Sequence, residues 1–155
     1  MTTTTNRHTY HAHVLWTGST KSGYRNYTRF HRAVAPPAPE VPLSADPHFR
    51  GDPAYLNPEQ LLVMAASSCQ LLSFLSVAAL HHLEILDYDD DAHGEMSDTG
   101  QPMRITHILL RPVITVATDT DHALVEPLVQ EAHHGCYIAN TLNSDVIVQP
   151  TVVTA

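Results

Sequence analysis

The segment from Leu61 to Leu80 constrains the fold most, because it carries no charged residue and is long enough to span a bilayer. Glu59 lies just before it and two histidines follow it. Its interior also holds several polar or thiol side chains: Ser67, Ser68, Cys69, Gln70, Ser73 and Ser76. A helix that is apolar nearly all round can equally form the centre of a soluble core. We therefore predict a buried core helix, with a membrane span as the alternative.

The start of this helix has a clear signal. Asn57 is a good N-cap residue, and Pro58 then occupies the first helical position, where its missing N–H costs nothing. Gln60 completes a capping-box pattern, and Glu59 adds negative charge to the first turn. The pattern predicts a helix that runs to about His82.

The rest of the chain alternates between strand-like and helical patterns. We predict strands over 8–17 and 24–34 that form a hairpin, an irregular segment over 35–42, a loop over 43–56, strands over 83–96 and 103–117, a helix from 120 or 121 to 134, a helical turn over 137–142 and a closing strand over 145–153. Pro112 favours a sheet edge or a bulge, and Gly135 suits the C′ position of the second helix. This order predicts one α+β domain over residues 1–155, with a flexible N-terminus over 1–7.

The charge of the chain argues against polyanionic partners. Acidic residues outnumber Lys and Arg by 16 to 8, and the formal net charge is −8. Such a chain is repelled by nucleic acid and by anionic membrane surfaces, so we expect neither as a partner. Met1–Asn6 has no apolar signal-peptide region, which predicts a cytoplasmic protein whose two cysteines are reduced, catalytic or simply buried.

Cys69 and Cys136 are the chemically most interesting residues. Taken alone, each is more often a small buried hydrophobe than a functional group. Both lie beside predicted helices, however, so the fold can bring them together. The 12 histidines form no HExxH or similar ligand pattern, so metal binding by a histidine-rich protein is only a third reading, and we expect no metal.

Two motifs resemble the OsmC/Ohr family. Residues 57–62 read NPEQLL and are followed by AASSC at 65–69, so that the first cysteine comes ten residues after Glu59; residues 49–52, FRGD, precede this run. The second motif, AHHGC at 132–136, ends on the other cysteine. The order of strands and helices agrees as well, from about Tyr10 to Val152.

The resemblance implies an OsmC-like fold, with antiparallel sheets around two long central helices in an intertwined homodimer. It implies a thiol-dependent peroxidase that reduces a small-molecule organic hydroperoxide without any cofactor. Cys69 would be oxidised to a sulfenic acid, and Cys136 would condense with it to a disulfide. An external dithiol, for example one of the lipoyl type, would then reduce that disulfide. The alternative is a non-enzymatic OsmC-like dimer that binds a small apolar ligand.

The resemblance also implies an arginine beside the first thiol and a glutamate that holds it. Arg50 is our first choice for the arginine and Arg29 the runner-up, with Glu59 as the glutamate. Ten residues of α-helix span about 15 Å, so Glu59 and Cys69 of one straight helix cannot share a small site. Either the helix bends near Glu59 or a partner subunit contributes it. We further expect an apolar substrate mouth, whose residues can equally be ordinary core: Tyr55, Leu56, Met64, Phe74 and Tyr137.

Overall fold

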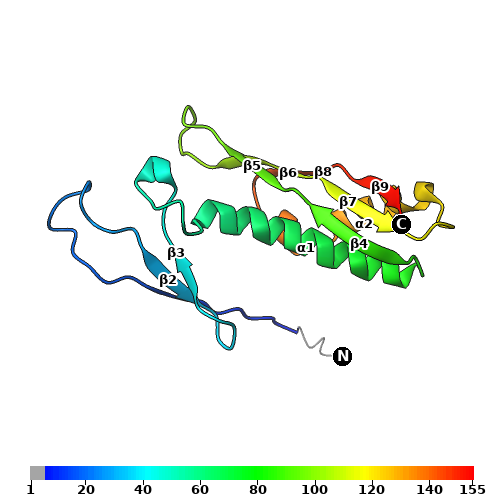
Figure 1. Ribbon diagram of the computed structural model, residues 1–155, viewed down its shortest axis with the longest axis horizontal. Helices are drawn as coiled ribbons and strands as arrows, with labels where there is room; N and C mark the ends of the chain where they lie inside the picture. Colours follow the sequence, from blue (N-terminus) through cyan, green and yellow to red (C-terminus); the bar gives the residue numbers. More distant parts are fainter. Residues whose placement is uncertain (1–5) are drawn as a thin grey trace, which may run out of the picture. The chain divides into compact units, whose positions relative to one another are not determined.

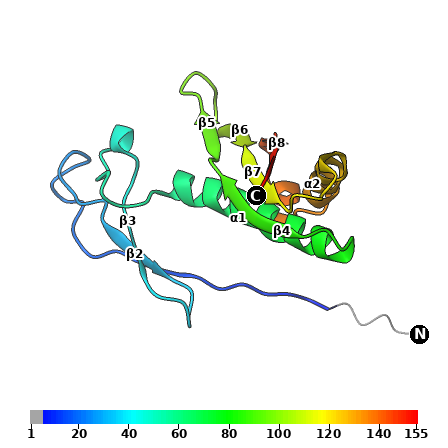
Figure 2. The ribbon, with the colours of Figure 1, turned by 45° about the vertical axis from the view of Figure 1, so that its right-hand side comes forward.

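The computed structural model describes residues 6–155, so the first five residues of the predicted flexible N-terminus lie outside the described residues. The chain divides into two compact units, Met1–Pro58 and Glu59–Ala155 (Figures 1 and 2). Each unit has its own sheet structure. The expectation of a single domain remains a prediction.

The first unit contains a three-stranded antiparallel sheet in the order β1-β2-β3, formed by β1 (His13–Leu15), β2 (His31–Val34) and β3 (Val41–Leu43). The predicted hairpin between the first two strands is confirmed, but both strands are much shorter than predicted. Residues 24–30 lie outside any strand, because the guanidinium of Arg29 bonds the carbonyls of Tyr27 and Tyr24 and holds this segment in a turn. The prediction of an irregular segment missed β3, in which Pro42 occupies an edge strand that tolerates its missing N–H.

A tight loop closes the first unit. Asp46 caps a short 3₁₀ helix, η1 (Pro47–Phe49), by accepting the backbone N–H of His48 at 2.7 Å. Arg50 follows in the left-handed conformation with φ 66°. Gly51 then passes so close to the backbone of Ala45 that a Cβ at this position would lie 1.5 Å from the Ala45 carbonyl oxygen. No other residue type fits there without moving the backbone.

The long helix α1 (Pro58–Leu80) starts where predicted. It ends two residues earlier than predicted because His82 adopts the left-handed conformation, with φ 56°. The N–H of His82 bonds the carbonyl of Ala79, and that of Leu83 bonds the carbonyl of Ala78, which together form a Schellman motif. This reversal directs the chain back along α1 into the first strand of the second unit.

Two three-stranded sheets form most of the second unit. One has the order β4-β7-β9 and the other the order β5-β6-β8. The strands are β4 (Ile85–Asp90), β5 (His93–Met96), β6 (Ile105–Leu110), β7 (Pro112–Val116), β8 (Asp145–Val148) and β9 (Thr151–Thr154). The β4–β7 and β5–β6 pairs are antiparallel, whereas β6–β8 and β7–β9 are parallel. The prediction of antiparallel sheets was therefore wrong for the last two strands, which a helical crossover returns in the direction of β6 and β7.

Each long strand predicted in this unit is split in two, and the three breaks lie side by side. The N–H of Arg111, at the break between β6 and β7, leaves the ladder and donates to the carboxylate of Asp90 at 2.6 Å. At the third break the N–H of Gln149 still reaches the carbonyl of Leu110 at 2.9 Å. Pro112 and Pro150 have no N–H to continue either ladder, which explains the breaks between β6 and β7 and between β8 and β9.

The second helical segment is shorter than predicted. Asp121 caps a 3₁₀ turn, η2 (His122–Leu124), and α2 (Val125–His134) begins only after it, because Pro127 cannot donate the backbone bond that would extend the α-helix backwards. Gly135 ends α2 with φ −90°, so it is not the left-handed C′ residue that was predicted. The predicted helical turn is confirmed as α3 (Tyr137–Thr141). Of the two long helices expected, only α1 is long.

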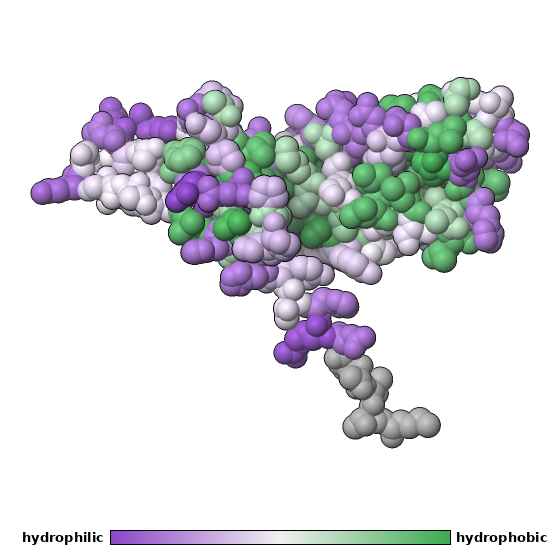
Figure 3. Space-filling view, turned by 60° about the horizontal axis from the view of Figure 1, so that its bottom comes forward, coloured by the Kyte–Doolittle hydropathy of each residue, from purple (hydrophilic) through white to green (hydrophobic). Residues whose placement is uncertain are grey.

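The core of the second unit lies between α1, α2 and the sheets. One stripe of α1 is buried at intervals of four residues: Ala66, Gln70, Phe74 and Ala78. It packs against side chains of the sheets and of α2, including Ile108, Ile114, Val125, Val129 and Val148. By length and composition α1 could cross a membrane, and 22% of its apolar window is buried within the structure. The opposite side of α1 exposes Met64, Leu72 and Leu75, and apolar side chains gather on this face (Figure 3).

Candidate active site

The two cysteines meet in the second unit. Cys69 lies in the middle of α1 and is partly exposed, while Cys136 precedes α3 and is only 1% exposed. Both are free thiols, and the two sulfur atoms are hydrogen-bonded to each other. The two cysteines that the sequence singled out therefore lie next to each other. The pair joins the middle of the chain to its last quarter.

Two further elements surround the sulfur of Cys69. The start of α3 directs the backbone N–H groups of Ile138 and Tyr137 at it. Ser73, one helical turn further along α1, donates its hydroxyl to the same atom. The sequence motif pointed to the cysteines but not to these donors. The only signal for them was the short helical pattern directly after Cys136.

These contacts favour a thiolate at Cys69. Burial works to raise the pKa of this thiol, but hydrogen bonds from the Ile138 N–H, the Cys136 thiol, the Tyr137 N–H and the Ser73 hydroxyl outweigh it. The result is a pKa below the ordinary value of a cysteine. Hydrogen bonds to the charged form of an acid stabilise that form, and the thiolate is the nucleophilic form of cysteine.

The pKa of Cys136 is shifted in the opposite direction, above the ordinary value of a cysteine. Burial raises its pKa, and the neighbouring Cys69 raises it further, since two adjacent thiolates repel each other. Bonds from the N–H groups of Ala139 and Ile138 only partly compensate. Cys136 is therefore the thiol that keeps its proton and donates it, and Cys69 is the sulfur that accepts. The two members of the pair are chemically distinct.

Glu59 lies at the first turn of α1. Its Oε2 atom is buried and has no hydrogen-bond partner in the described part of the chain. The helix is continuous from Pro58 to Leu80, so Glu59 and Cys69 of one chain are separated by about 15 Å along the axis. A buried carboxylate oxygen without a partner is costly, and a guanidinium is the group that best satisfies it. The role of this glutamate remains a prediction.

The two candidate arginines belong to the first unit, and both approach the ring of Tyr24. The guanidinium carbon of Arg29 lies 4.7 Å from the centroid of this ring and that of Arg50 lies 5.9 Å from it. Arg29 is already committed, because it donates to two backbone carbonyls and stacks on Tyr27 at 3.7 Å. Arg50 has no such bonds among the described residues, and it is more than a third exposed.

The residues expected at a substrate mouth fall into different environments. Tyr55 and Leu56 are half-buried in the first unit, where the ring of Tyr55 packs edge-on against Phe30. Met64 and Tyr137 of the second unit are exposed, at 50% and 80%. Phe74 is completely buried in the core and contacts the ring of Tyr88.

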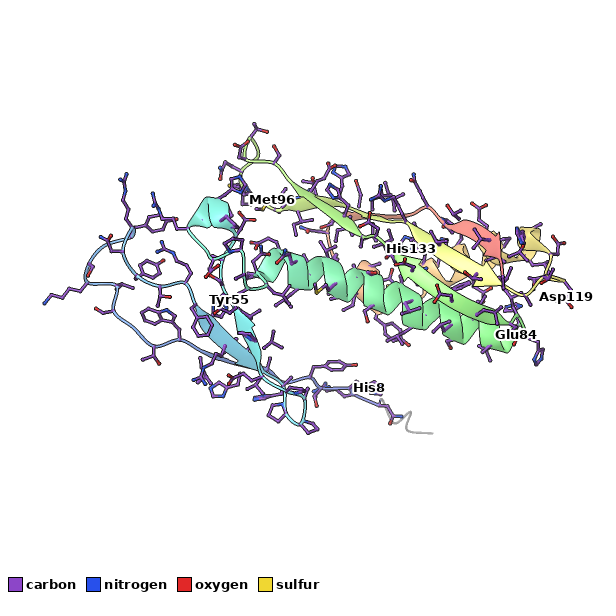
Figure 4. The ribbon with its side chains drawn as sticks, viewed as in Figure 1. His8, Tyr55, Glu84, Met96, Asp119 and His133 are labelled. Carbon is purple, nitrogen blue, oxygen red and sulfur yellow. The ribbon has the colours of Figure 1, made fainter. Side chains whose placement is uncertain are left out.

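The histidines do not converge. Within residues 6–155, no group of three or more His, Cys, Asp or Glu side chains could hold a metal ion. His133, labelled in Figure 4, is half-buried, and burial lowers its pKa. One ring nitrogen bonds the carbonyl of Val146, while Nδ1 is buried without a partner among the described residues. The ring is therefore a neutral element of the packing between α2 and β8.

Comparison with known proteins agrees with the fold and the motifs. The model of the OsmC-like protein family matches residues 51–151, a range that includes Glu59, Cys69 and Cys136 and begins one residue after Arg50. The chain therefore belongs to the OsmC-like protein family, and its α+β architecture is an OsmC-like fold. No curated protein matches the chain.

Solved structures of this family are similar over nearly the whole chain. An OsmC-like protein from Vibrio cholerae O1 biovar eltor is 26% identical, with a TM-score of 0.85 over 94% of this chain and 100% of the other. An OsmC-like protein from Mycoplasma pneumoniae is 15% identical, with a TM-score of 0.75 over 94% and 98%. An organic hydroperoxide resistance protein from Elizabethkingia anophelis is 17% identical, with a TM-score of 0.72 over 97% and 99%.

Proposed function

We propose that this protein is a thiol-dependent peroxidase that reduces organic hydroperoxides, with Cys69 as the nucleophile and Cys136 as the resolving thiol. The observation that carries this proposal is the hydrogen-bonded pair of sulfur atoms whose pKa values are shifted in opposite directions. A peroxidase of this kind needs one thiol that is ionised and accessible, and a second that stays protonated within bonding reach. Cys69 and Cys136 meet these two requirements in that order.

In the first step the Cys69 thiolate attacks one oxygen of the hydroperoxide. The O–O bond breaks, the sulfur becomes a sulfenic acid, and the organic alkoxide leaves and takes up a proton as the alcohol. In the second step the Cys136 sulfur attacks the Cys69 sulfur. The S–OH bond breaks, the thiol proton and the leaving hydroxide form water, and a Cys69–Cys136 disulfide remains. An external dithiol, for example one of the lipoyl type, then reduces this disulfide by exchange.

Arg50 and Glu59 complete the proposed site. A guanidinium about 4 Å from a thiolate supplies about 4 kcal/mol at an effective dielectric of 20, before desolvation is subtracted. Arg50 is the better candidate, because the donors of Arg29 already bond two carbonyls. The unpartnered Oε2 of Glu59 supports a bidentate pair with that arginine. Since Glu59 and Cys69 of one chain lie far apart along α1, we propose that each site combines residues of two subunits.

A homodimer is consistent with the surface of α1. Met64, Leu72 and Leu75 are at least 40% exposed on one side of the helix that carries Cys69. A second copy that covers this apolar stripe would place a subunit interface beside the thiols. Met64 and Tyr137 are then candidates for an apolar mouth, which would favour a hydroperoxide with a hydrocarbon tail over hydrogen peroxide. We place the protein in the cytoplasm, where two working thiols are kept reduced.

Titration with cumene hydroperoxide and thiol counting test the proposal. The wild type should lose two thiols per chain for one equivalent of peroxide, much faster than free cysteine. Cys69→Ser should abolish this loss, and Cys136→Ser should leave one oxidisable sulfur that dimedone traps. Wild-type oxidation at the rate of free cysteine would contradict the peroxidase and favour the dimer that binds a small apolar ligand.

A further inference from the structure

The residue after the nucleophile occupies an unusual position. Gln70 is completely buried within the apolar core of the second unit, with a relative exposure of 0%. Its Nε2 donates to the backbone carbonyl of Val129 in α2 at 3.2 Å. Its Oε1 is buried and has no partner in the described part of the chain. A buried amide with one unmet acceptor costs stability, so packing alone does not explain a glutamine at this position.

The bond of Gln70 connects the two helices on which the thiols depend. Gln70 is the sequence neighbour of Cys69 on α1. Val129 lies two helical turns before Cys136, which follows the end of α2 after Gly135. The bond ties the Val129 backbone of α2 to the Gln70 side chain of α1, so sliding of α2 past α1 would break it. A shift of α2 along its axis would move Cys136 by the same amount relative to Cys69.

We propose that Gln70 is a positioning residue for disulfide formation, which fixes the register of α2 on α1 and so holds the Cys136 sulfur against that of Cys69. This inference rests on the proposed function, since condensation of the two sulfurs is the step that benefits. The side-chain amide of Gln70 donates to the Val129 carbonyl and not to either sulfur, so Gln70 acts through α2. Its contribution is therefore to the geometry of the step in which Cys69–S–OH and Cys136–SH form the disulfide and water.

The inference can be tested without peroxide, by equilibration of the protein with mixtures of reduced and oxidised glutathione. The fraction of disulfide gives the effective concentration of one thiol at the other. Gln70→Met keeps the volume but removes both the donor and the unmet acceptor. We expect this variant to lower the effective concentration by about 10- to 100-fold, since small displacements have effects of this size. The melting temperature of its reduced form should equal or exceed that of the wild type, because an unpaired buried oxygen is gone.

Val125→Ala is the matched control. Val125 is fully buried one turn before Val129 on the same face of α2, and its side chain forms no hydrogen bond. This variant should lower the melting temperature and leave the effective concentration unchanged. The inference would be overturned if Gln70→Met had the same effective concentration as the wild type. It would also be overturned if Val125→Ala lowered the effective concentration as much as Gln70→Met does.

A second variant covers the case in which Gln70→Met does not fold. Gln70→Glu keeps the shape, and a buried carboxyl stays neutral and can donate its O–H to the Val129 carbonyl. It should restore an effective concentration near that of the wild type, whereas Gln70→Leu should not. If the wild type fails to react with cumene hydroperoxide, the peroxidase proposal is contradicted, yet the glutathione equilibrium still decides the role of Gln70. Equal effective concentrations in Gln70→Glu and Gln70→Leu would exclude that role.

Discussion

Ser67, two residues before Cys69 on α1, donates a 2.5 Å hydrogen bond to the carboxylate of Asp90 on β4. The other oxygen of this carboxylate accepts the backbone N–H of Arg111 at 2.6 Å, where β6 ends and β7 begins. One side chain thus joins the helix that carries Cys69 to the break in the sheet.

Asp90→Ala should lower the free energy of unfolding by about 1–3 kcal/mol, because it leaves the Arg111 N–H and the Ser67 hydroxyl without their acceptor. Urea unfolding at pH 7 measures this difference. Asp89→Ala is the control, since the Asp89 side chain on the same strand is exposed. Equal losses in the two variants would show that the contacts of Asp90 do not stabilise the fold.

Tyr88→Phe should make the protein more resistant to alkali. Burial raises the pKa of Tyr88, and the negative charges of Asp90 and Cys136 raise it further. Its hydroxyl is buried without a partner among the described residues. An unfolded tyrosine ionises near pH 10, so the wild type loses stability as the pH rises above about 10, while its folded phenol stays protonated.

Thermal unfolding at pH 8 and pH 10.5 measures this effect. The melting temperature of Tyr88→Phe should fall less than that of the wild type between the two values. At pH 8 the variant should be no less stable, since it removes only an unpaired hydroxyl. The same alkaline decrease in both proteins would contradict the prediction.

The two thiols should titrate in a fixed order. Alkylation with iodoacetamide, followed by mass spectrometry, should label Cys69 at lower pH than Cys136, because burial and the Cys69 thiolate raise the pKa of Cys136. The lowered pKa of Cys69 adds stability above the ordinary cysteine pKa, and this contribution is lost as the pH falls through the lowered value.

Ser73→Ala should raise the pKa of Cys69, because it removes one donor to the thiolate, and should slow its alkylation at pH 7. Ser76→Ala, an exposed position further along the same helix, should leave the profile unchanged. If Ser73→Ala and Ser76→Ala shifted the pH profile of Cys69 alkylation equally, a specific hydrogen bond from Ser73 to Cys69 would be ruled out.

Arg50 and Arg29 should respond differently to substitution. Arg50→Ala should lower kcat/KM for cumene hydroperoxide by on the order of 100-fold, as expected when one electrostatic partner of a reacting group is removed. Arg29→Ala should instead lower the melting temperature, since the carbonyls of Tyr27 and Tyr24 lose their donor. A large rate loss with unchanged stability in Arg29→Ala would identify Arg29 as the active arginine.

The sequence predicted features that depend on local chemistry. Asn57 and Pro58 located the start of α1, and the two cysteine motifs identified the pair of thiols. It did not reveal features that depend on contacts between distant segments. The strand breaks require Asp90 to meet the N–H of Arg111. The parallel pairing of β8 with β6 and of β9 with β7 depends on where α2 returns the chain.

The same distinction holds for the site. Gln70 is buried because it faces α2. The sequence did not predict this, because α1 is apolar with little periodicity and its pattern does not show which face is buried. The donors from Tyr137 and Ile138 are backbone groups, so no residue type marks them. The sequence already favoured Arg50 over Arg29, but the bonds of Arg29 to two backbone carbonyls are visible only in the structure.

The near-contact of Gly51 with the carbonyl of Ala45 has a consequence for sequence variation. Any side chain at this position would occupy space already taken by another peptide group, so the loop has no neutral substitutions there. In a library that randomises residues 47–51 and is selected for folding, position 51 should recover glycine alone. The exposed residues Pro47 and His48 should accept many alternatives, so that tolerance changes abruptly within a single turn.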